Sequence, residues 1–105
     1  MSYRLDIRPL ALLDITEAAQ WYENRQPGLG QKFIQEVVAA IDALPAHPFI
    51  YRIRNKRLGA RWAFPNHFPY RIVYCVREDF ITIAAVIHAA RHDRHWKDRF
   101  HSKQG

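Results

Sequence analysis

The segment FPYRIVYCVREDFITIAAVIHAAR, residues 68–91, decides the fold that this sequence predicts. It is typical of two β-strands joined by a tight turn, because apolar residues alternate with small or basic ones on either side of Glu78 and Asp79. A two-residue loop fixes the register of the two strands. The predicted pairs are Arg77 with Phe80, Cys75 with Thr82, Val73 with Ala84 and Arg71 with Val86.

This register assigns each residue of the hairpin to one of two faces, since strand side chains point alternately to opposite sides. The first face is large and apolar and must be buried; it consists of Phe68, Tyr70, Ile72, Tyr74, Val76, Ile81, Ile83, Ala85 and Ile87. The second face is small and basic; it consists of Arg71, Val73, Cys75, Arg77, Thr82, Ala84, Val86 and His88. Antiparallel sheets often bury only one face. We therefore expect the second face to be open, with Arg91 just beyond it, and to carry the function.

The residues before the hairpin predict one strand and two helices. Tyr3, Leu5 and Ile7 alternate with charged residues, which predicts a short strand that ends at Pro9. Apolar residues then recur at helical spacing on both sides of a Pro-Gly breaker: Leu12, Ile15, Ala18, Ala19 and Tyr22 before it, and Phe33, Val37, Ile41 and Leu44 after it. Such a helical hairpin would supply the apolar layer that the first face requires.

Two further stretches link the helices to the hairpin. Residues 51–59, YRIRNKRLG, are typical of a strand that enters a basic turn, and residues 60–64 alternate as another strand. The expected fold is a single α+β domain over residues 1–105 of order β-α-α-β-β-β, with an N-terminal strand and an αα hairpin packed on one face of an antiparallel sheet. We expect the short C-terminal tail to hold one helical turn anchored by Trp96, and residues 101–105 to be disordered.

Composition limits the class of protein and the kind of partner. The chain has 105 residues, 49% of them hydrophobic, so it can form an ordinary core without disulfides. Its one cysteine, Cys75, excludes an intramolecular disulfide and suits a reducing cytosol. The formal charge of +6 favours an acidic partner such as nucleic acid, a ribosome or an acidic protein segment. No apolar run approaches the roughly 20 residues of a membrane helix, so we expect a soluble, cytoplasmic protein without membrane association.

A basic cluster is the first candidate site. Its members are Arg52, Arg54, Lys56, Arg57, Arg61, Arg71 and Arg91, and we expect Arg52, Arg54 and Arg71 on neighbouring strands. Guanidinium groups pair bidentately with phosphate and stack on bases, so a row of them could hold an RNA backbone, a DNA–protein complex or an acidic helix. The alternative is that these arginines only solvate the open face. Arg71 argues against that alternative, because a charge in the most apolar strand needs a partner or an open site.

A histidine group is the second candidate. His88, His92 and His95 would have the spacing of metal ligands on a helix, but no acidic or thiol ligand completes the set. We therefore expect no metal and no cofactor. His88 could also act as a general acid or base, since imidazole titrates near neutral pH.

The order of these segments resembles the RelE/ParE superfamily of type II toxin–antitoxin toxins, which serve in plasmid stabilisation modules. The similarity covers nearly the whole chain and is most specific in FPYRIVY at 68–74, the acidic turn, the apolar strand, and His88-x-x-Arg91 with Trp96 after it. The resemblance implies an αα hairpin packed on a curved antiparallel sheet, and a cognate antitoxin, encoded nearby, whose C-terminal segment wraps the toxin. The formal charge of +6 predicts that this antitoxin is acidic. It also allows a toxin dimer within a toxin–antitoxin hetero-oligomer.

Within that superfamily two activities compete. RelE-like members cut mRNA in the ribosomal A site, and for such an endonuclease the catalytic residues here would be Arg71, His88 and Arg91. ParE-like members inhibit DNA gyrase without cutting RNA. Ala89 and Ala90 stand where catalytic groups would help a nuclease, so the sequence favours a gyrase inhibitor that acts by binding rather than as an enzyme. The expected target-binding residues are then Arg52, Arg54, Arg61, Arg71, Arg91 and Trp96.

Overall fold

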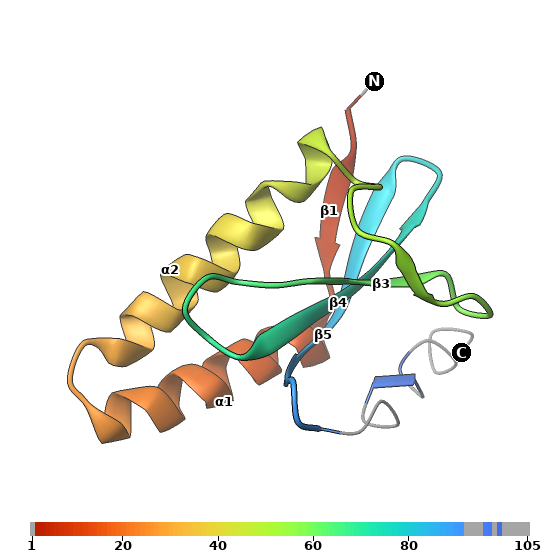
Figure 1. Cartoon of the computed structure of the whole chain (residues 1–105). Helices are drawn as coiled ribbons and strands as arrows, with labels where there is room; N and C mark the ends of the chain where they lie inside the picture. Colours follow the sequence, from red (N-terminus) through yellow and green to blue (C-terminus); the bar gives the residue numbers. More distant parts are fainter. Residues whose placement is uncertain (1, 92–95, 98, 100–105) are drawn as a thin grey trace.

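Two helices cover one face of a five-stranded sheet in the computed structural model (Figure 1). The structure describes residues 2–91, 96, 97 and 99. Residues 101–105, predicted to be disordered, lie outside the described residues, as do His92 and His95 of the histidine group. No helix in the described part of the chain has the length and apolar character needed to cross a membrane.

The elements confirm the α+β fold class, with the helices between the first strand and all the others. Their bounds are β1 Arg4–Ile7, α1 Pro9–Arg25, α2 Leu29–Asp42, a 3-10 turn η1 Leu44–Ala46, β2 Ile53–Asn55, β3 Ala60–Ala63, β4 Tyr70–Arg77 and β5 Phe80–His88. Four strands follow the helices. The predicted strands in residues 51–59 and 60–64 correspond to β2 and β3, and the order β-α-α-β-β-β counted only three of these four strands. The first strand does end before Pro9, whose fixed φ suits the first position of α1.

The strand order is β1-β5-β4-β3-β2, so the long hairpin of β4 and β5 lies in the middle of the sheet. The strands from β2 to β5 pair antiparallel, but β1 pairs parallel to β5. The sheet is therefore mixed, and the expectation of a wholly antiparallel sheet was wrong for β1. A four-residue alternating pattern carries no sign of strand direction, which here follows from how α1 leaves β1 and packs over β5.

The helical hairpin is held by a close contact at the turn. Gly30 lies so near α1 that a Cβ atom there would stand 2.4 Å from the carbonyl oxygen of Ala19. The carboxylate of Glu23, in the last turn region of α1, accepts the backbone N–H groups of Gly28 and Gly30 at 2.9 and 3.0 Å. Backbone N–H groups at the start of a helix have no acceptor within the helix, so the carboxylate supplies one. Its negative charge also interacts favourably with the positive end of the helix dipole.

The predicted apolar stripe of α2 is confirmed, since Phe33, Val37 and Ile41 are buried. In α1 the stripe is shifted by about one position: Ala11 is fully buried, whereas Leu12 is 51% exposed. The buried residues of α1 are three alanines, Ala11, Ala18 and Ala19, together with Ile15, and Leu12 lies outside the core.

A β-bulge in β5 corrects the predicted register of the central hairpin. Next to the turn the pairs are as predicted, with Cys75 opposite Thr82. Beyond it the register shifts by one, so that Val73 pairs with Ala85 and Arg71 with Ile87; Ala84 is the extra residue. A bulge reverses the alternation of the strand that carries it. Consequently Val86 packs on the helix side and Ala85 and Ile87 on the other side, opposite to the prediction for these three residues.

The second face of the sheet is not open, and that expectation was wrong. A second apolar cluster covers it, formed by Ala60, Val73, Cys75, Ala84, Ala85, Ile87 and Trp96, with Leu58 and Trp62 at its border. Trp96, in a helical stretch of the C-terminal segment, is fully buried there. The predicted anchoring of the tail by Trp96 is thus confirmed. Trp96 therefore both anchors the C-terminal segment and covers the second face of the sheet.

Candidate functional site

Arg71 of β4 is buried, with only 7% of its surface exposed, and its charge is surrounded by acceptors. One guanidinium nitrogen, Nη2, donates to the carbonyl oxygens of Ala89 at 3.0 Å and Arg91 at 2.7 Å. The guanidinium carbon also lies 4.1 Å from the centre of the Trp62 ring. Of the two conditions that the sequence set for Arg71, a partner or an open site, the structure provides the partner. Arg71 thereby fixes the turn that follows β5.

Trp62 connects Arg71 to the basic segment of β2. Arg54 places its guanidinium carbon 4.5 Å from the centre of the same ring. Because β3 lies between β2 and β4, Arg54 and Arg71 are not on neighbouring strands as predicted, and Trp62 of β3 bridges them. We call Arg54, Trp62, Arg71 and the backbone of Arg91 the arginine–tryptophan row. Sequence reasoning missed Trp62, although its alternation with Arg61 on a strand beside basic residues was a usable signal.

Arg61 belongs to the opposite side of the sheet. It pairs with Tyr74, whose ring is buried in the helix-side cluster. The Arg61 guanidinium donates to the carbonyl oxygen of Tyr51 and lies 5.1 Å from the Phe49 ring centre. Tyr74 in turn donates its hydroxyl to the carbonyl oxygen of Pro48 at 3.1 Å, and burial raises its pKa to about 12. These contacts fasten the segment before β2 to the sheet.

His88 also leaves the sheet on the helix side, because the bulge reverses the end of β5. Its ring packs edge-to-face on Tyr70 at 5.2 Å, and its Nδ1 accepts the backbone N–H of Ala90 at 3.0 Å. Arg71 faces the second cluster, so the two side chains that a nuclease would use point to opposite faces. The prediction that His88 and Arg71 share a face was wrong.

A cavity of about 560 Å³ lies between α1 and the ends of β4 and β5, next to His88. Its walls are aromatic, formed by Trp21, Tyr22 and Tyr70, and Arg91 also lines it. Burial raises the pKa of both Tyr22 and Tyr70. Both hydroxyls therefore stay protonated at neutral pH, and the lining combines these aromatic groups with the charged side chains of Asp14, Glu17 and Arg91.

Three of the predicted target-binding arginines are exposed: Arg52, Arg54 and Arg91. Arg71 and Trp96 are buried, so any part they take in target binding is through the positions of their neighbours. Among the described residues, no group of three His, Cys, Asp or Glu side chains is placed to hold a metal ion.

Comparisons with known proteins agree with this architecture. The family model described as the ParE toxin of the type II toxin–antitoxin system parDE matches residues 5–93. A comparison with curated protein sequences finds no match. Among solved structures, a chain of the "Chromosomal ParDE TA system from P. aeruginosa" is similar with a TM-score of 0.72 and 19% sequence identity, over 82% of this chain and 95% of that chain. At that identity the structural likeness establishes the shared fold.

Proposed function

We propose, from the premise that this chain belongs to the ParE toxin family of type II toxin–antitoxin systems, that it arrests growth by binding DNA gyrase. The activity is the one that the superfamily resemblance implies for ParE-like members. The proposed site of action is the cytoplasm, where gyrase and DNA are found.

The observation that carries the choice of target is the separation of Arg71 from His88 by the bulge in β5. Cleavage of RNA through its 2′-hydroxyl needs a base, a cation on the phosphate and an acid around one reacting group. Here the Arg71 guanidinium binds two backbone carbonyls on one face, and His88 lies against Tyr70 on the other. This geometry supports inhibition by binding over the RelE-like alternative of a ribosome-dependent mRNA endonuclease.

The binding surface that we propose is basic and lies at both ends of the arginine–tryptophan row. Inhibition by binding needs only a complementary surface, and exposed arginines beside a tryptophan are frequent anchors of such surfaces. Arg52 and Arg54 are exposed at β2, and Arg91 is exposed after β5. Arg71 and Trp62 connect these ends, so the row would present the arginines in a fixed arrangement. Arg61 would act from the helix side by holding residues 49–51.

Assaying one preparation against both targets tests the proposal. We expect purified toxin to inhibit supercoiling by gyrase and to leave ribosome-bound mRNA intact. Cleavage of A-site mRNA at codon-phased positions, with supercoiling unaffected, would replace the proposal by the nuclease alternative.

Variants of the basic surface refine this test. An Arg52→Ala/Arg54→Ala double variant should need about 30-fold more protein for half-inhibition of supercoiling, because two contacts of about 1 kcal/mol each contribute about 2 kcal/mol together. Arg77→Ala removes the same charge from an exposed position beside the hairpin turn and is the matched control. A double variant as potent as Arg77→Ala would remove β2 from the binding surface.

A further inference from the structure

The edge of β5 is covered by β1 for only part of its length. The parallel pairing ends with Ile7 opposite Ile83, and the backbone N–H of Arg8 donates to the carbonyl oxygen of Ile83 at 3.0 Å. The chain then enters α1 at Pro9. Beyond this point the bulge presents the carbonyl of Ala84 and the N–H of Val86 at an edge that β1 does not reach. Exposed groups at a sheet edge invite pairing with another chain, and proteins usually cover them.

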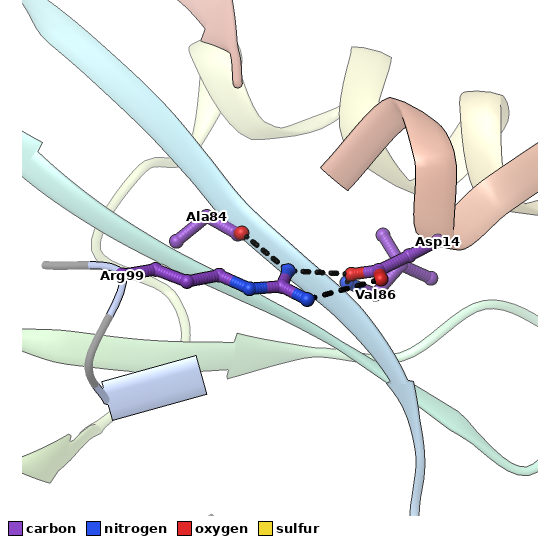
Figure 2. Close-up of polar contacts among 4 residues, drawn as sticks. All are labelled: Asp14, Ala84, Val86 and Arg99. Atoms are coloured by element: carbon purple, nitrogen blue, oxygen red, sulfur yellow. Dashed lines mark hydrogen bonds and ion pairs between the residues drawn. The ribbon is translucent and has the colours of Figure 1, made fainter. Parts of the chain in front are cut away.

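Asp14 of α1 and Arg99 of the C-terminal segment cover this edge together (Figure 2). Asp14 Oδ2 accepts the N–H of Val86 at 2.9 Å, and Arg99 Nη1 donates to the carbonyl oxygen of Ala84 at 3.0 Å. The two side chains also pair with each other through both guanidinium ends, at 2.7 Å to Oδ2 and 3.2 Å to Oδ1. The fork geometry of arginine and carboxylate makes such a pair strong and directional.

The pair is largely withdrawn from solvent, with side-chain exposures of 20% for Arg99 and 15% for Asp14. In this position each charge needs the other, because either one alone would be left poorly solvated against the strand. Figure 2 shows that the groups come from three separate parts of the chain: α1, β5 and the C-terminal segment. Trp96, in the same segment as Arg99, fills the cluster on the second face. The segment is thus attached both on that face and at the β5 edge.

We infer that Asp14 and Arg99 form a clip that fastens the C-terminal segment to the β5 edge, keeps Trp96 buried, and thereby positions the basic surface around Arg91 for its target. The clip itself rests on the contacts above. Its positioning role rests on the proposed function, since it concerns the same binding surface. Arg71 acts from the start of the segment by holding the carbonyls of Ala89 and Arg91, whereas the clip acts from its far end.

The test uses the full chain and two kinds of readout. Arg99→Ala and Asp14→Ala break the clip, Arg99→Lys keeps the charge but loses the fork, and Arg77→Ala is the exposed charge control. NMR follows the indole N–H signal of Trp96, assigned with Trp96→Phe, and the hydrogen exchange of the Val86 amide. Supercoiling inhibition is measured on the same samples.

We expect Arg99→Ala to make the Trp96 indole signal exchange with solvent, and Asp14→Ala to do so and also to speed exchange at Val86 by about tenfold or more, as expected for loss of a charge-assisted hydrogen bond. Both should weaken inhibition by about tenfold, with Arg99→Lys in between and Arg77→Ala unchanged. A Trp96 signal that stays protected in Arg99→Ala would overturn the clip. If Trp96 is released but inhibition is unchanged, the positioning role of the clip is overturned. If the wild-type protein leaves gyrase active, the proposed function is refuted, and the NMR result still decides whether the clip exists. If Asp14→Ala does not fold, Arg99→Ala and Arg99→Lys carry the test.

Discussion

Arg71 places a positive charge on the second face of the sheet, where backbone carbonyl oxygens and an aromatic ring contact its guanidinium group. Two carbonyls bind its guanidinium and the Trp62 ring stacks on it, which ties together β3, β4 and the turn after β5. A buried arginine that holds two backbone carbonyls has a structural task, whichever target the protein binds. Truncation at this position therefore removes contacts that the fold uses.

Arg71→Ala should lower the free energy of unfolding by about 2–4 kcal/mol, because the carbonyls of Ala89 and Arg91 would lose a charged donor and Trp62 its stacking partner. Arg71→Lys should lose less, since an ammonium can still reach one carbonyl but cannot stack as a plane. Urea unfolding followed by tryptophan fluorescence measures both, with Arg52→Ala as an exposed control. An Arg71→Ala variant with the wild-type midpoint would show that the burial of this charge contributes nothing to stability.

Tyr74 predicts how stability falls in alkali. Burial raises its pKa from 10.0 to about 12, so folding favours the protonated hydroxyl that donates to Pro48. Its contribution is complete below pH 10, where the unfolded chain also keeps the proton, and it is lost as the pH rises through about 12.

Tyr74→Phe should cost about 1 kcal/mol at pH 8 through the lost hydrogen bond, and should lose less stability than the wild type between pH 10 and pH 12. Tyr22 and Tyr70 also have raised pKa values and are present in both proteins, so the comparison isolates Tyr74. Urea midpoints at pH 8, 10 and 11.5 give the measurement. Parallel decreases in the two proteins would contradict the assignment.

At the scale of elements, the sequence correctly predicted those features of helices and strands that are determined within a single segment of the chain. The buried stripe of α2 follows from helical periodicity, and the pairing beside the turn follows from loop length, so Phe33 and Cys75 are where they were expected. The bulge at Ala84 was not predictable in this way, because it depends on how β5 packs between α1 and the tail. From that one residue follow the errors on Val86 and His88. The predicted site residues are therefore divided between the two faces of the sheet.

The crossing of the two helices gives a test with a built-in control. Gly30→Ala should destabilise the protein by about 2–4 kcal/mol, although alanine is the better helix former by about 1 kcal/mol, because its Cβ would stand 2.4 Å from the carbonyl oxygen of Ala19. Gly28→Ala meets no atom within 4 Å, and only its φ of +89° is strained, so it should cost about 1 kcal/mol. Thermal unfolding compares the two. Equal losses would mean that the helices adjust their distance freely.

At the scale of the whole molecule, charge and exposed apolar surface point to one kind of partner. The chain carries a formal charge of +6. Large apolar side chains are nonetheless exposed, notably Phe49, Ile50, Ile53 and Phe64 around β2, and Leu10, Leu13 and Trp21 on α1. Exposed apolar residues beside arginines suit a segment that is both acidic and amphipathic. We therefore propose that the cognate antitoxin is such a protein. A toxin dimer within the complex stays a prediction.

The antitoxin prediction is tested by the kinetics of association. Opposite charges should accelerate encounter, so the association rate constant should fall by about tenfold or more between 50 and 500 mM salt, while the dissociation rate constant, set by the buried apolar contacts, should change little. The partner to use is the product of the adjacent reading frame, co-expressed with the toxin and separated from it before stopped-flow mixing. Ile53→Asp should raise dissociation because it places a carboxylate in the exposed apolar surface of β2. Arg77→Ala, at the hairpin end of β4 and separated from β2 by β3, should leave dissociation unchanged. An association rate that does not respond to salt would contradict the electrostatic part of the argument. Recovery of the toxin alone at high level, from cells that tolerate it, would contradict the need for an antitoxin at all.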